Sequence, residues 1–242
     1  MISFPSLESL WLEATSTLRR FPIVLFLTIL TTILAIALSE VTDNANEHWA
    51  LTRLVMSSAL ATLFCLSVAL MTEKYRWGYG KGLLYQLLAI ALTAIYYWFD
   101  TEVENNTTLI RFALLLIFVH LWVAIAPYIM PENNNGFWQY NQRLFIRFLI
   151  SLLYTGVLYV GLALAIQAIK TLFNADINDR IFSRLFIFLI GIFNTWFFLA
   201  GIPRDFEALE KDESYPKGLK LFTQYVLLPL VVIYFVILYA YS

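Results

Sequence analysis

Residues 148–169 read FLISLLYTGVLYVGLALAIQAI, a long run without a single Asp, Glu, Lys or Arg. The hydrocarbon core of a bilayer is about 30 Å thick, and a helix needs roughly 20 residues to cross it. The run shows no alternation of apolar and polar residues with a period of two, so we expect a helix and not a strand. A helix also pairs its backbone N–H and C=O groups internally, as hydrocarbon requires. These residues predict a transmembrane helix.

Six further runs have the same character and approach the same length. The whole chain is 60% apolar and only 14% charged, whereas soluble domains carry about 25% charged residues. Short polar segments separate the runs, and none could hold a separate globular domain. We therefore expect an all-α fold, a polytopic bundle of about seven transmembrane helices, with residues 1–242 forming a single domain. The predicted helices cover residues 22–38, 54–71, 82–99, 112–130, 148–169, 185–202 and 219–239.

The charges of the loops predict the orientation of this bundle, because Lys and Arg in short loops favour the cytoplasmic side. Eleven of the 16 Lys and Arg residues lie in the N-terminal segment and in every second loop after it. This asymmetry predicts a cytoplasmic N-terminus and, with seven crossings, an external C-terminus. A seven-helix receptor has the opposite orientation, and a retinal protein would need a lysine within residues 221–239, which hold none.

Few residues are suited to chemistry. The net charge of −1 gives no reason to expect nucleic acid as a partner, since that partner needs a basic face. Cys65 is the single cysteine, which excludes an intrachain disulfide and a cysteine-based zinc site. No charged residue lies in the middle of a run, which argues against a proton-coupled transporter driven by carboxylates. We expect no catalytic residue, no metal and no cofactor.

Two polar side chains are predicted to lie near the middle of the membrane. His120 lies in run 112–130 and could relay protons or bind a ligand, although such residues more often bond a neighbouring helix. Asn194 lies deep in run 185–202, where it could line a polar cavity or cross-link two helices. His120 and Asn194 are therefore the candidate polar centre of the bundle.

Arg143 and Arg147 lie one helical turn apart at the predicted cytoplasmic end of the fifth helix, after Trp138 and Tyr140. Two cations at this level could contact an anionic lipid headgroup. The alternative is that they are ordinary orientation signals.

Small residues and one loop predict further structure. Ser57, Ala61, Cys65 and Ala69 recur at a spacing of four and form a ridge that would let helix backbones approach. In residues 203–220, the longest charged loop, apolar residues three positions apart predict a short helix on the cytoplasmic interface. That helix could dock a partner or be a solvated connector.

Three longer strings carry a family resemblance. NGFWQYNQRL (135–144), FNTWFFLAGIP (193–203) and YPKGLKLFTQYVLLPL (215–230) resemble the bacterial membrane proteins grouped as domain of unknown function 4153, and FPSL (4–7) with RFP (20–22) fits the start of that family. The resemblance implies a multi-pass protein of the bacterial inner membrane, with no established reaction or ligand. Family members commonly continue further, so we expect a truncated N-terminal module of a longer chain, with a natural short form as the alternative.

These observations leave three hypotheses about function. The first is a non-enzymatic scaffold or partner-binding protein, or a transporter of a lipid-like or small neutral solute. The second is an intramembrane enzyme that modifies lipids, with His120 as the base. The third is the membrane anchor of a signalling or regulatory protein. The expected partners are membrane lipids and either another protein or a second copy of the chain.

Overall fold

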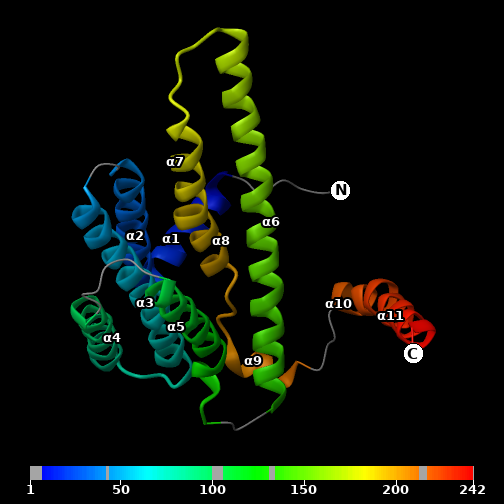
Figure 1. Cartoon of the computed structure of the whole chain (residues 1–242). Helices are drawn as coiled ribbons and strands as arrows, with labels where there is room; N and C mark the ends of the chain where they lie inside the picture. The colour runs from blue at the N-terminus through cyan, green and yellow to red at the C-terminus, as the bar shows by residue number, and fades with distance from the viewer. Residues whose placement is uncertain (1–6, 42–43, 100–105, 131–133, 213–216, 242) are drawn as a thin grey trace.

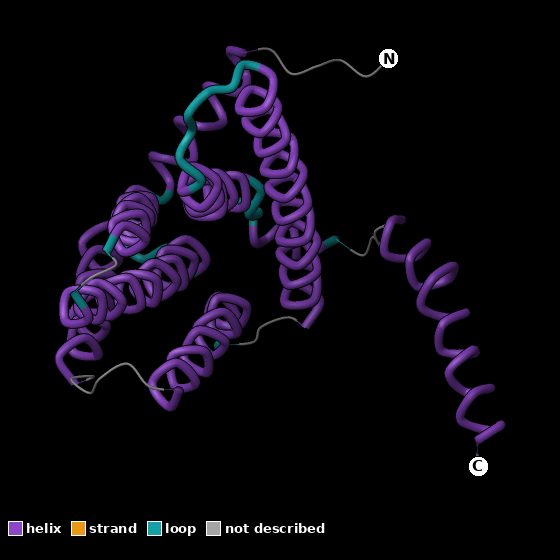
Figure 2. The backbone as a smooth tube through the Cα atoms, turned by 45° about the horizontal axis from the view of Figure 1, so that its top comes forward, coloured by secondary structure: helices purple, strands orange, loops and turns teal. Residues whose placement is uncertain are grey.

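The computed structural model describes all residues except 1–6, 42–43, 100–105, 131–133, 213–216 and 242, and within the described part it contains helices and no strand (Figures 1 and 2). Parts of the strings 4–7 and 215–230 therefore lie outside the described residues. The helices are α1 (Leu7–Arg20), α2 (Pro22–Glu40), α3 (Ala45–Lys74), α4 (Tyr79–Phe99), α5 (Asn106–Ile125), α6 (Asn134–Leu172), α7 (Arg180–Phe188), α8 (Asn194–Ala200), α9 (Phe206–Lys211), α10 (Lys217–Phe222) and α11 (Leu228–Tyr241).

The all-α prediction is confirmed for the described residues, and each predicted run lies in a helical segment apart from the last two residues of runs 112–130 and 185–202. Within the described part of the chain, six segments are long and apolar enough to cross a membrane, and α4, which holds run 82–99, is not among them. The count of about seven therefore stays a prediction. The six segments are Pro22–Glu40, Ala45–Lys74, Asn106–Tyr128, Asn135–Leu172, Arg180–Ala200 and Lys220–Tyr241.

Three prolines explain where helices begin, end or widen. Pro22 opens α2, a position where its missing N–H costs no hydrogen bond. Pro127 lies in a short 3-10 turn that closes α5 at Tyr128. Pro229 lies in the first turn of α11, directly after the π-helical turn Thr223–Leu227. A proline ring clashes with the carbonyl four residues before it, and a widened turn relieves that clash.

Helix α3 is the central helix of the best-packed part of the bundle, between α2 and α4. The predicted small-residue ridge is confirmed as a packing face, because Ser57, Ala61, Cys65 and Ala69 are all buried. By contrast, Gly156 and Gly161 of α6 have no neighbouring atom within reach of an added Cβ. Their spacing of five makes no contact with another helix in this structure.

Helix α4 runs antiparallel to α3 along most of its length. Gly82, near the start of α4, lies against Thr72 near the end of α3. In the middle, the Gln86 amide donates to the Cys65 carbonyl at 3.5 Å. At the other end, Arg53 donates to the carbonyl of Tyr97 at 3.4 Å.

The ends of α2 and α7 are joined at the far end of the bundle. Glu40 accepts hydrogen bonds from Arg180 at 3.1 Å and from Arg184 at 2.7 Å. This pairing links residues about 140 positions apart in the sequence. Each of the three side chains is a third to a half exposed.

A second group of helices is built on α6, the longest helix, which lies beside α7 and α8 (Figure 1). Its first turns are polar and precede run 148–169, so α6 extends well before the predicted start. The C-terminal pair α10–α11 stands apart from the other helices in both views (Figures 1 and 2). None of the described residues of α11 is buried.

Candidate functional site

The side chain of Arg20 donates four hydrogen bonds at the end of the bundle where α3 ends and α9 lies. It lies at the junction of α1 and α2, immediately before Phe21 and Pro22. Its guanidinium donates to both carboxylate oxygens of Glu73, at 2.8 and 2.7 Å. It also donates to the carbonyls of Ile202 and Pro203, each at 2.7 Å. With its side chain only 9% exposed, Arg20 ties α3 to the segment that follows α8.

The first turns of α6 hold the residue that follows α9. Asn135 and Gln139 donate to the carbonyl of Asp212, at 3.0 and 2.7 Å. Arg143 forms an ion pair with the carboxylate of the same Asp212. Asn135, Gln139 and Arg143 are spaced by four, so they lie along one face of the helix. This face explains three polar positions of the string 135–144.

Arg147 lies one turn further along α6. Its Nε donates to the carbonyl of Phe197 at 3.1 Å, and its guanidinium lies 4.0 Å above the Phe197 ring. Gly201 provides the space for this side chain, because a Cβ there would lie 1.8 Å from the Nε of Arg147. We call these connected polar side chains the polar hub. Its members are Arg20, Glu73, Asn135, Gln139, Arg143, Arg147 and Asp212.

An aromatic cluster lies beneath the polar hub. Tyr140 is fully buried and donates to the carbonyl of Val123 at 3.1 Å. Its ring lies 5.6 Å from that of Tyr128 and 5.8 Å from that of Phe206. Because Tyr128 closes α5 and Phe206 opens α9, this contact joins three segments of the chain. Leu209 of α9 is buried against the same core, which confirms the predicted short helix within loop 203–220.

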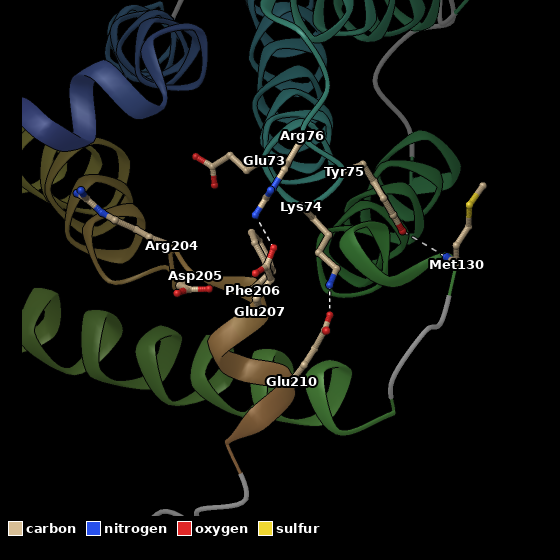
Figure 3. Close-up of a pocket in the computed structure, with 10 residues that line it drawn as sticks. All are labelled: Glu73, Lys74, Tyr75, Arg76, Met130, Arg204, Asp205, Phe206, Glu207 and Glu210. Carbon is tan, nitrogen blue, oxygen red and sulfur yellow. Dashed lines mark hydrogen bonds and ion pairs between the residues drawn. The ribbon is translucent and has the colours of Figure 1, made fainter.

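A charged cleft of about 580 Å³ separates the end of α3 from α9 (Figure 3). Lys74 pairs with Glu210, and Arg76 pairs with Glu207 from the opposite wall. Asp205 caps α9 by accepting from the N–H of Ala208 at 2.9 Å. The lining residues are Glu73, Lys74, Tyr75, Arg76, Met130, Arg204, Asp205, Phe206, Glu207 and Glu210.

Arg76 enters the cleft from a strained backbone. Its φ of 50° is left-handed, a conformation that costs a residue with a Cβ about 1–2 kcal/mol. The N–H of Trp77 bonds the carbonyl of Thr72, and the N–H of Arg76 bonds that of Glu73, at 3.0 and 3.3 Å. This is the Schellman ending of a helix, where glycine is the usual residue. An arginine at this position directs a long cationic side chain across the cleft.

The structure gives the two predicted polar-centre residues different partners. His120 is exposed on α5, and its Nδ1 lies 2.7 Å from the carbonyl of Leu116 in the same helix. Asn194 is half-buried at the start of α8, and its Oδ1 accepts from Thr155 of α6 at 3.2 Å. Asn194 thus makes the inter-helix bond expected of the cross-linking alternative. Neither residue lines the charged cleft.

Arg143 and Arg147 lie in successive turns of α6, as predicted, and each has a protein partner. Arg143 is half-exposed beside Asp212, and Arg147 is engaged by Phe197. Contact with an anionic headgroup stays a prediction for both.

Sequence reasoning missed Arg20, Glu73 and the acidic residues of α9 as members of a site. In the sequence, Arg20 is one member of the string 20–22 and of the loop charges, and Lys74 is one of the loop charges only. A usable signal is present: Glu73 and Lys74 follow run 54–71, and an equally mixed set of charges fills loop 203–220. Opposite charges at the same end of a bundle are natural partners.

The fold and the hub define the class, a multi-pass helical membrane protein with a charged cleft at one end. The sequence model of the family described as Domain of unknown function (DUF4153) matches residues 9–242, so the chain belongs to this family. Neither the curated proteins nor the solved structures include a protein that matches this chain.

Proposed function

We propose that this chain is a non-enzymatic module of a bacterial inner membrane that binds a ligand or partner in the charged cleft at its cytoplasmic face. The observation that carries the proposal is the position of the family strings on both sides of α9, the helix that forms one wall of this cleft. Asn135, Gln139 and Arg143 of one string hold Asp212 directly after α9, and Gly201 of another receives Arg147 in the segment before α9. These residues do not line the cleft, but their contacts fix the segment that does, which supports the cleft as the ligand site.

We further propose that α4 is a seventh membrane crossing. With 21 residues, α4 is about 31 Å long, enough for the hydrocarbon core. Its contacts with α3 at Thr72, Cys65 and Arg53 follow α3 along most of the length of α4. A helix that accompanies a membrane-crossing neighbour over this distance crosses the membrane with it.

The proposed orientation places the hub and the cleft in the cytoplasm. Arg20, Lys74, Arg143, Arg147 and the cations of the 203–220 loop belong to the larger set of loop charges. Arg53, Arg180 and Arg184 of the smaller set lie at the far end. The two charge sets therefore correspond to the two ends of the bundle.

A ligand site in the interior of the bundle is less well supported than one in the charged cleft. A proton relay or an intramembrane base at His120 needs a polar route to that residue, and its ring nitrogen bonds its own helix on an exposed face. Asn194 is engaged with Thr155. A transporter or lipid-modifying enzyme would place its ligand at these residues; the proposed binding module places it at the cleft.

Cysteine labelling in intact cells tests the topology. In a Cys65→Ser background, we expect a membrane-impermeant maleimide to label Thr107→Cys and Asn178→Cys but to spare Gly78→Cys and Glu207→Cys until the cells are opened. Labelling of Glu207→Cys from outside would refute the orientation. Protection of Thr107→Cys would refute the crossing of α4.

Site-specific photo-crosslinking tests the working part. A photoreactive phenylalanine at Met130 or Glu207 should yield adducts in cells, whereas one at His120 should not exceed the exposed control Phe118. Adducts confined to His120 would favour the bundle interior and overturn the proposal.

A further inference from the structure

The cleft walls carry charges of both signs. Lys74, Arg76 and Arg204 face Glu73, Asp205, Glu207 and Glu210. Two of these acids already have partners within the protein, since Glu73 forms an ion pair with Arg20 and Asp205 caps α9. Arg76 and Glu207 are both largely accessible, with side chains 80% and 65% exposed. Figure 3 shows the two side chains directed toward each other from opposite walls of the cleft.

The pair of Arg76 and Glu207 can be separated at little cost, because ion pairs between exposed side chains contribute little to stability. A purely anionic ligand would take Arg76 and leave Glu207 without a partner. A purely cationic ligand would do the reverse. A molecule that carries both a phosphate and an ammonium group gives Arg76 an anionic partner and Glu207 a cationic one when it separates the pair. The mixed cleft therefore favours a zwitterion.

A buried hydroxyl without a hydrogen bond lies next to the cleft, on Tyr128, which is not itself one of the lining residues. Tyr128 is 6% exposed, and its OH makes no hydrogen bond in this structure. Its ring lies 4.9 Å from the Nζ of Lys74, so the phenol lies directly behind the pair of Lys74 and Glu210. Buried hydroxyls are normally bonded, and an ammonium or phosphate group that reached Lys74 and Glu210 would also lie near this one.

The position of the cleft along the membrane normal suits a lipid. Glu73 to Arg76 follow directly after run 54–71, which sets them at the depth of the headgroups. The apolar side chains of Met130 and Phe206 line the same cleft. A lipid headgroup could place its charges between the walls while its glycerol region contacts these two residues.

We infer that the cleft binds a phosphate ester that carries a primary ammonium group, the chemistry of a phosphatidylethanolamine headgroup and of its soluble glycerol ester. The phosphate accepts from Arg76. The ammonium donates to Glu207. A primary ammonium has three N–H donors, whereas the quaternary group of phosphatidylcholine has none. This inference rests on the proposed function, which sets the cleft at the cytoplasmic face.

Native mass spectrometry of the full chain, with phosphatidylethanolamine, phosphatidylglycerol or phosphatidylcholine added to detergent, tests the inference. We expect retention of phosphatidylethanolamine to exceed that of the other two by about tenfold, the effect of one charge-assisted hydrogen bond. Soluble glycerophosphoethanolamine is the second arm. Competition by it would assign recognition to the headgroup alone, and failure to compete would assign it to the intact lipid.

Glu207→Ala removes the acceptor of the ammonium group and leaves Arg76 for the phosphate that all three lipids share. We expect this variant to unfold like the parent, because the ion pair that it loses is exposed, but to lose the preference, while Lys81→Gln, an exposed cation outside the cleft, retains it. Arg76→Gln should lower the retention of all three lipids. Equal retention of the three lipids by the parent, or an unchanged preference in Glu207→Ala, would overturn the inference. If Glu207→Cys is labelled from outside, the proposed function fails instead.

Discussion

The polar hub and the C-terminal helices α10–α11 are neighbours in sequence and are built in opposite ways. Asp212 of the hub has three partners on α6, whereas α11, which begins 16 residues later, has no buried residue. The hub is held by directional bonds, whereas the residues of α11 are exposed along its whole length. In lipid, apolar faces have no preference for one another over the acyl chains. Apolarity therefore sets which segments enter the membrane, and polar contacts set how they are arranged.

The largest effect should come from Arg20→Ala. It removes four hydrogen bonds and leaves Glu73 without its cation, so the free energy of unfolding should fall by about 3–5 kcal/mol, as for buried ion pairs that lose one partner. Unfolding by SDS in mixed micelles measures this loss. The exposed neighbour Arg19 is the matched control, and Arg19→Ala should change stability by less than about 0.5 kcal/mol. If the two variants lost the same free energy of unfolding, the bonds of the polar hub would not be what stabilises this end of the bundle.

Gly201→Ala should come next. The added Cβ would lie 1.8 Å from the Nε of Arg147 and would displace that side chain from Phe197, at a cost of about 1–3 kcal/mol. Gly156→Ala is the control, because nothing lies near its Cβ and alanine is the better helix former by about 1 kcal/mol. We expect opposite signs for the two substitutions in the same unfolding assay. If both substitutions changed the free energy of unfolding in the same direction, the helix propensity of alanine, and not the contact with Arg147, would determine the effect.

Asp205→Ala should have a smaller and more local effect. It removes the cap of α9, worth about 1 kcal/mol, while Asn at this position keeps an acceptor. Amide hydrogen exchange should show faster opening of α9 in Asp205→Ala than in Asp205→Asn, with α3 unchanged. Loss of protection in α3 as well would show that α9 and the hub open together.

The smallest effect should be that of Ile233→Ala in α11. Ile233 is 55% exposed, whereas Leu70 of α3 is fully buried. Truncation of Leu70 should cost about 2–5 kcal/mol, and truncation of Ile233 less than about 0.5 kcal/mol in the same assay. A large cost at Ile233 would show that α11 packs against protein in the membrane, which would end the contrast between the two regions.

The helices were predictable, and the hub was not, for a physical reason. Membrane-spanning runs are set by local composition, so 22–38 and 148–169 could be read from a window of about 20 residues. The ridge at Ser57, Ala61, Cys65 and Ala69 follows from helical spacing in the same way. The pair of Arg20 and Glu73 joins residues 53 positions apart, and nothing local distinguishes this pair from any other opposite charges.

The candidate site shows the same division. Arg143 and Arg147 were found because they lie one turn apart on a single helix. The aromatic contacts of Tyr140 with Tyr128 and Phe206 depend on how α5, α6 and α9 meet, and no single string contains all three residues. His120 was selected because a titratable residue within an apolar run is rare, but rarity does not reveal which face of α5 it occupies.

The bonds of Arg20 also have a consequence for biosynthesis. Its acceptors at Ile202 and Pro203 lie 182 and 183 residues downstream. At about 5–20 residues per second, roughly 10 to 40 s of translation separate the arginine from these carbonyls. Glu73 emerges after roughly 3–10 s by the same rate and supplies the first counter-charge. The nascent chain can therefore neutralise its earliest buried cation long before the ribosome completes the segment that finally encloses it.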